Sequence, residues 1–199
     1  MDTTETRANE ILTRLLAGNH RFADNKLKHP HQNPAARIQL FEQQRPDAVI
    51  LSCSDSRVAP EVIFDQGLGD IFSIRVVGHV ADASAIESIE YAVTQLRAGI
   101  IMVMGHQHCG GVRGAIHKLR SGGSTSDSVL LSEIGKSVRV AIESDITDAD
   151  DIERVHVAQT LETLIDKSEA IRQAVARGDV RLVGARYVME TGLVEILSF

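Results

Sequence analysis

Short continuous apolar runs alternate along the chain with longer segments whose apolar residues recur at helical spacing. The runs at residues 48–53, 70–77 and 99–106 are typical of buried strands, and those at 181–188 and 193–197 predict a C-terminal hairpin around residues 190–192. The segments at 83–97, 111–119, 129–144 and 150–177 predict helices. This order predicts right-handed crossovers and a mainly parallel sheet.

The first 45 residues follow a different pattern. Apolar positions between residues 4 and 25 predict one helix, and an Asn33-Pro34 start signal predicts a second helix over residues 33–44. The connector between them contains His29 and His31, which we interpret as exposed linker histidines rather than metal ligands.

The predicted fold is therefore α/β. It has a mainly parallel central sheet with an antiparallel C-terminal edge strand, flanking helices and an N-terminal helical extension. A length of 199 residues with 43% hydrophobic composition suits a single hydrophobic core. We expect one domain over residues 1–199, in which residues 1–45 form an N-terminal helical arm.

Net charge and the length of the apolar stretches indicate which partners and which compartment to expect. A formal net charge of −6 predicts no basic surface for nucleic acid. No apolar stretch approaches the roughly 20 residues of a membrane span, and the acidic start lacks the features of a secretory signal. We expect a cytoplasmic protein that binds neither nucleic acid nor membrane.

The two cysteines, Cys53 and Cys109, are too few for a disulfide scaffold. They are either buried apolar thiols or metal ligands. The methionines in GIIMVMGH (residues 99–106) are interpreted as core residues rather than copper ligands.

Candidate chemistry lies directly after two predicted strands, where sites form in open parallel sheets. One strand ends in CSDSR (residues 53–57), and the other leads into HQHCGG (residues 106–111). His106 and Cys109 form a His-x-x-Cys step, and Cys53 would be a third ligand from the neighbouring strand end. Three such ligands leave one tetrahedral position open, as in catalytic zinc sites. His108 is a weaker candidate, because its i+2 spacing from His106 directs it elsewhere.

These two motifs, in this order and separation, resemble the C-x-D-x-R and H-x-x-C elements of the β-carbonic anhydrase family. The resemblance extends through RVAPEVIFDQGLGDIFSIRVVG and IEYAV, and covers most of the chain from Gln44 onward. It implies one Zn²⁺ per subunit on Cys53, His106 and Cys109, with Asp55 and Arg57 as a catalytic pair. It also implies the following substrate-pocket residues: Gln44, Phe72, Val77, Tyr91 and Gly110.

From spacing alone, Gln44 would be assigned to a solvated helix end, and Phe72, Val77 and Tyr91 to the core. In the family, several pocket residues reach the metal from a neighbouring subunit, which implies a homodimer or homotetramer. The implied activity is reversible hydration of carbon dioxide to bicarbonate and a proton through a zinc-bound hydroxide.

Two alternatives remain. Relatives of this family hydrolyse carbonyl sulfide or carbon disulfide with the same ligands. A non-catalytic zinc or thiol-responsive protein is the other alternative, and the Asp55 and Arg57 pair argues against it. His79 stands where the family usually has asparagine. It is either a proton relay or, as we favour, a histidine hydrogen-bonded in a loop.

Overall fold

The computed structural model describes residues 3–198, with side chains from residue 5 onward. Its strands are β1 (Ala48–Ser52), β2 (Ile71–Arg75), β3 (Ile100–His106), β4 (Arg181–Tyr187) and β5 (Val194–Leu197). Its helices are α1 (Thr3–Ala23), α2 (Pro34–Gln39), α3 (Pro60–Ile63), α4 (Ala83–Thr94), α5 (Gly110–Arg120), α6 (Val129–Glu143), α7 (Ala149–Lys167) and α8 (Glu169–Ala176), and η1 is a 3₁₀ turn at Val77–His79.

The strands form one sheet in the order β2-β1-β3-β4-β5, in which only the β4–β5 pair is antiparallel. This arrangement confirms the predicted α/β class with its antiparallel edge strand. Gly192, with φ of 76°, provides the left-handed residue that the β4–β5 connection needs.

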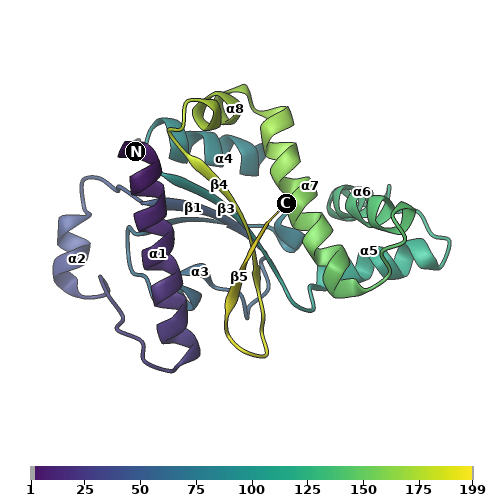
Figure 1. Cartoon of the computed structure of the whole chain (residues 1–199), viewed down its shortest axis with the longest axis horizontal. Coiled ribbons are helices and arrows are strands. Elements are labelled where there is room, and N and C mark those ends of the chain that lie inside the picture. The colour runs from purple at the N-terminus through teal and green to yellow at the C-terminus, as the bar shows by residue number, and fades with distance from the viewer. Residues whose placement is uncertain (1–2, 199) are drawn as a thin grey trace.

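Alternating side chains of the central strands enter two separate hydrophobic layers. One layer contains Ile50 and Met102 beneath α1 and α3, and the other contains Leu51 and Val103 beneath α4, α7 and α8. The methionines are therefore core residues, as predicted. Figure 1 shows α1 crossing one face of the sheet and α4, α7 and α8 on its other side.

A third hydrophobic cluster lies beyond the carboxyl ends of β1 and β3. It contains Cys53 and Cys109 together with apolar residues of α5 and α6, such as Val112 and Ile134. In Figure 1, α5 and α6 extend at one end of the molecule and α2 lies at the opposite end. The α5–α6 pair thus encloses the sheet edge at which the predicted site lies.

Several predicted element boundaries were wrong. The helix expected over residues 33–44 ends at Gln39, and residues 150–177 form two helices because Ser168 ends α7 and caps α8. Val77 is not in a strand, since Gly78 adopts φ of 65° and turns the chain there. Within the described residues, no helix is both long and apolar enough to cross a membrane.

Candidate metal centre

Cys53, His106 and Cys109 meet at the carboxyl edge of the sheet. Cys53 directly follows β1, His106 is the last residue of β3, and Cys109 is the N-cap of α5. Because β1 and β3 are parallel neighbours, both strand ends face the same edge. Their ligand atoms all lie within 4.8 Å of one another, and all three residues are buried.

The hydrogen bond of the His106 ring favours the tautomer that a metal ligand needs. Its Nδ1 lies 3.0 Å from the Gln107 carbonyl oxygen, which can only accept, so Nδ1 donates and Nε2 keeps its lone pair. That Nε2 is buried and has no hydrogen-bond partner among the described residues. A cation at the centre of the three ligands would satisfy this atom.

The two thiols are close enough to share one proton. A hydrogen bond from Cys109 lowers the pKa of Cys53 to about 4, and the same bond raises the pKa of Cys109. The Gly78 amide donates to Cys53 Sγ at 3.3 Å and further favours the thiolate. Two sulfur ligands, one of them already favoured as a thiolate, together with an imidazole nitrogen fit a zinc-type ion.

Asp55 and Arg57 form a bidentate pair just outside this centre. Arg57 Nε and Nη2 donate to the two carboxylate oxygens at 2.9 and 2.7 Å, and this pairing lowers the pKa of Asp55. Arg75 of β2 donates to the backbone carbonyls of Cys53 and Asp55, at 3.2 and 2.6 Å, and so fixes the loop. The carboxylate is thereby held in place beside the centre.

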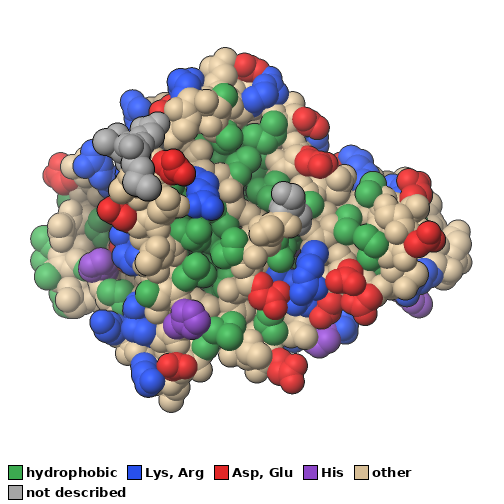
Figure 2. Space-filling view, viewed as in Figure 1, with side chains coloured by type: hydrophobic (Ala, Val, Ile, Leu, Met, Phe, Trp, Pro, Cys, Tyr) green, Lys and Arg blue, Asp and Glu red, His purple; other side chains and the backbone are tan. Residues whose placement is uncertain are grey.

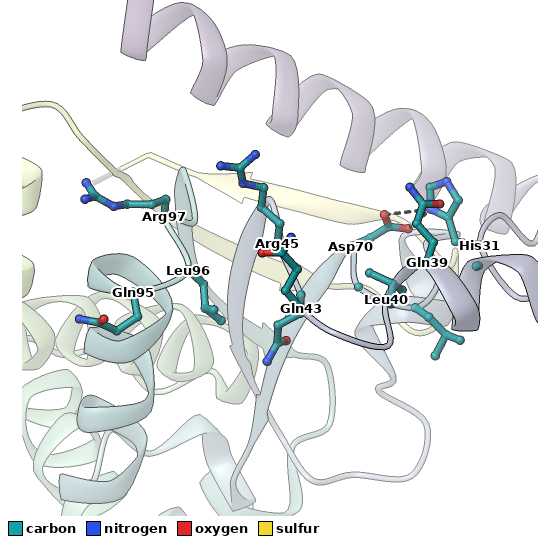
Figure 3. Close-up of a pocket in the computed structure, with 13 residues that line it drawn as sticks. His31, Gln39, Leu40, Gln43, Arg45, Asp70, Gln95, Leu96 and Arg97 are labelled. Carbon is teal, nitrogen blue, oxygen red and sulfur yellow. Dashed lines mark hydrogen bonds and ion pairs between the residues drawn. The ribbon is translucent and has the colours of Figure 1, made fainter.

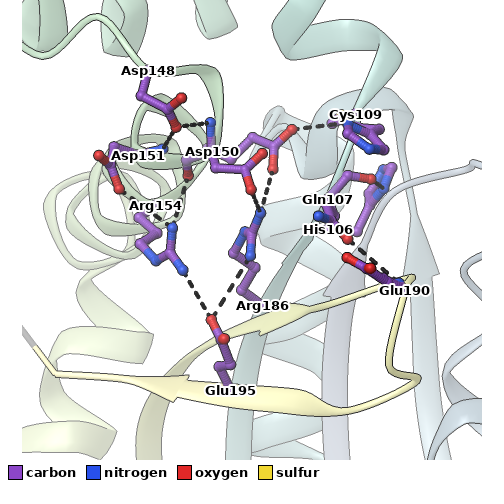
Figure 4. Close-up of polar contacts among 12 residues, drawn as sticks. His106, Gln107, Cys109, Asp148, Asp150, Asp151, Arg154, Arg186, Glu190 and Glu195 are labelled. Carbon is purple, nitrogen blue, oxygen red and sulfur yellow. Dashed lines mark hydrogen bonds and ion pairs between the residues drawn. The ribbon is translucent and has the colours of Figure 1, made fainter.

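A network of charged side chains, partly buried, holds the backbone of Cys109. Glu153 of α7 accepts a hydrogen bond from the Cys109 amide at 3.0 Å, and its carboxylate lies 3.4 Å from Arg186. Arg186 also pairs with Asp150 at 2.7 Å and lies 3.8 Å from Glu195 (Figure 4). Burial raises the pKa of Glu153, and the Cys109 amide and Arg186 oppose that effect. Figure 2 shows charged side chains of both signs gathered over this region.

Two of the predicted pocket residues lie beside the ligands of their own chain. Gly110 directly follows Cys109 and is exposed, and among the described residues outside its own turn no atom lies within 4 Å of the position a Cβ would occupy. Val77, in η1, is 41% exposed and lies against Gly111 at the start of α5. Both therefore lie beside the candidate metal centre and are exposed.

The other three pocket residues lie elsewhere in the chain. Phe72 pairs with Val49, four residues before Cys53, which corresponds to roughly 13 Å along the strand. It contacts Tyr91 of α4, whose ring is 49% exposed rather than in the core. Gln44 lines a polar cavity of about 600 Å³ that none of the three metal-ligand candidates lines (Figure 3).

Two histidines near the centre do not join it. His108 is exposed and contacts Arg113. His79 is fully buried, and neither ring nitrogen has a hydrogen-bond partner among the described residues, so the hydrogen-bonded loop histidine that we favoured is not found. Burial holds the pKa of His79 well below its usual value, so a proton carried on a cationic His79 is disfavoured as well.

Sequence analysis missed the residues that support the ligands from behind. Glu153 and His156 are three residues apart in an otherwise polar-looking segment, which places them on one helix face. Arg186 offered a signal, since a charged residue inside the predicted buried strand requires an acidic partner. Nothing in the sequence identified which acid that partner would be.

Fold and site together define an α/β protein with a buried Cys-His-Cys centre at the carboxyl edge of its sheet. The sequence profile of the carbonic anhydrase family matches residues 48–194. The chain belongs to the carbonic anhydrase family of enzymes, and its fold is that of the β class.

Individual relatives agree with this assignment. Carbonic anhydrase 2 of Mycobacterium tuberculosis is 39% identical over 89% of this chain and 87% of its own length. The carbonic anhydrase of Mycolicibacterium smegmatis is 40% identical, covering 91% and 89% of the two chains. Among solved structures, a tetrameric β-carbonic anhydrase of Sordaria macrospora superposes with a TM-score of 0.73 at 27% identity, covering 94% of this chain and 97% of that one.

Proposed function

We propose that this protein catalyses the reversible hydration of carbon dioxide to bicarbonate and a proton, with one zinc ion per subunit held by Cys53, His106 and Cys109. The observation that carries the proposal is the set of three buried ligand atoms within 4.8 Å of one another. A three-residue set leaves a coordination position for the reaction, as catalytic zinc sites do. When bound, zinc supplies a Lewis acid that makes a hydroxide nucleophile available near neutral pH.

Asp55 and Arg57 are proposed to control access to that position. With Arg57 holding both carboxylate oxygens, Asp55 stays clear of the ligands and can accept a hydrogen bond from the attacking hydroxyl group, which orients that group. Without Arg57, the carboxylate would be free to turn toward the metal and block the reaction.

The substrate pocket is proposed to be completed by a second copy of the chain. Val77 and Gly110 lie beside the ligands of the same chain, whereas Phe72, Tyr91 and Gln44 lie away from their own ligands. An exposed aromatic residue such as Tyr91 is typical of interfaces. A homodimer, or a homotetramer such as the one from Sordaria macrospora, would place these side chains against a neighbouring centre.

The test combines zinc stoichiometry with stopped-flow measurement of carbon dioxide hydration. We expect one zinc per chain and rapid hydration, with both lost in Cys53→Ala. His108→Ala is the matched control, because this exposed histidine directly precedes Cys109 and lies outside the cluster. Parallel assays with carbonyl sulfide and carbon disulfide test the alternative substrates, and a zinc-loaded chain inactive on all three would contradict the proposed function.

A further inference from the structure

Two side chains within one turn of helix α7 hydrogen-bond to backbone groups that hold the two cysteine ligands. Glu153 accepts the Cys109 amide directly, at 3.0 Å. Three residues later, His156 Nε2 lies 2.8 Å from the Gly78 carbonyl oxygen, and the Gly78 amide donates to Cys53 Sγ. The spacing of three residues places both side chains on the same face of the helix.

The hydrogen bonds of His156 fix its tautomer. A carbonyl oxygen only accepts, so Nε2 carries the proton that it donates to Gly78. Nδ1 then accepts from the Ser137 hydroxyl at 2.8 Å. Burial lowers the pKa of His156 to about 4, which keeps the ring neutral at physiological pH. The result is a directed chain of donors that runs from Ser137 through His156 and Gly78 to Cys53.

Gly78 needs such an anchor because of its conformation. Its φ of 65° lies in the left-handed region, and a Cβ there would lie 2.6 Å from Ile134. A glycine in a short turn retains many alternative conformations unless its polar groups are held. Holding its carbonyl from one side aims its amide at the thiolate on the other side.

We propose that His156 and Glu153 are positioning residues that set the two thiolates of the metal centre, His156 through Gly78 and Glu153 through the Cys109 amide. Arg186 offsets the buried carboxylate of Glu153 and also pairs with Asp150. The inference rests on the proposed zinc site, because it concerns the geometry of the ligands. Loss of outer-shell partners in metal sites typically weakens metal binding by about 10- to 100-fold.

The first experiment separates the two hydrogen bonds of His156. In His156→Gln the side-chain amide can occupy the place of Nε2 and still donate to Gly78, whereas the shorter side chain of His156→Asn reaches only toward Ser137. We expect Zn²⁺ dissociation, measured by chelator competition, to be near wild type in His156→Gln and about 10-fold or more faster in His156→Asn. With Co²⁺ in place of zinc, the sulfur-to-cobalt charge-transfer absorption should shift only in His156→Asn.

The second experiment addresses Glu153. Replacing Glu153 and Arg186 together by leucine removes the acceptor for Cys109 without leaving either charge buried alone. We expect Zn²⁺ binding to weaken by about 10-fold in this double variant. Arg154→Leu is the matched control, since Arg154 belongs to the same charged surface but pairs with Asp151 and Glu195.

The outcomes distinguish positioning from general stability. A cobalt spectrum and Zn²⁺ affinity in His156→Asn equal to those of His156→Gln, with only a lower melting temperature, would overturn the proposal. Unchanged Zn²⁺ affinity in the double variant would also overturn it. A wild-type chain that binds neither ion would instead refute the proposed zinc site, and the inference would fail with it.

Discussion

The metal centre and the substrate pocket of this protein are built in different ways. Each of the three ligand candidates sits within or directly next to a strand or helix end of one chain, and their atoms converge within 4.8 Å. The pocket residues divide, because Val77 and Gly110 lie beside the ligands while Phe72 and Tyr91 pack on each other elsewhere. The three candidate ligands therefore meet within a single chain, whereas the proposed pocket needs a second copy of the chain.

This difference follows from chain topology. Parallel neighbours necessarily bring their carboxyl ends to one edge, so two short motifs after two such strands meet without any further partner. A residue in the first half of a strand, such as Phe72, cannot reach that edge in its own chain. Under the proposed function it serves a centre across an interface, and association would then be part of the active site.

The largest effect should come from breaking the centre itself. Cys109→Ala leaves two protein ligands, so zinc and hydration activity should both disappear at every protein concentration. Metal analysis and stopped-flow hydration on the same samples test this expectation. Full zinc occupancy in Cys109→Ala would show that the ligand set is wrong.

A smaller loss of activity is expected when Asp55 loses its partner Arg57. Arg57→Ala removes the bidentate partner while the three ligands remain, so zinc should be retained and activity should fall by about 100-fold, the scale of a misplaced catalytic group. Asp55→Ala, which cannot block the metal, should lose less. An Arg57→Ala enzyme as active as wild type would refute the proposed control of access.

A substitution in the proposed pocket should reduce activity less than a substitution in the metal centre. Phe72→Ala should keep full zinc occupancy and lose activity by roughly 10-fold, in keeping with the loss of a packed aromatic contact. Val129→Ala is the control, since Val129 is 72% exposed at the start of α6. Loss of zinc in Phe72→Ala would mean that this residue supports the centre of its own chain.

Mixing an inactive chain with an impaired one tests the comparison directly. In a mixed dimer of Cys109→Ala and Phe72→Ala, one site combines intact ligands with an intact neighbouring Phe72. Random exchange should therefore restore about a quarter of the wild-type sites. Activity equal to the sum of the separate variants, despite exchange confirmed by mass spectrometry, would place Phe72 outside the neighbour's pocket.

The parts that could be predicted from sequence are those encoded locally. The apolar runs around residues 48–53 and 99–106 located β1 and β3, and the motifs that follow them located the ligands. The supports Glu153, His156 and Arg186 could not be predicted, because they meet the ligands only after α7 and β4 pack on the sheet. The interruption between α7 and α8 at Ser168 was missed for a related reason, since helical periodicity continues across this residue.

Ser168 provides the smallest predicted effect, and one that should leave the centre untouched. Its hydroxyl accepts the Ile171 amide at 3.0 Å, which caps α8, and donates to Glu90 of α4. Ser168→Ala removes the cap and should lower the free energy of unfolding by about 1 kcal/mol, measured by urea denaturation. Zinc content and hydration rate should stay at wild-type values, because Ser168 lies at the far end of α7 from Glu153 and His156. Ser126→Ala, an exposed loop serine, is the control. If Ser168→Ala were instead as stable as wild type, the end of α7 would be set by packing against α4 rather than by the cap.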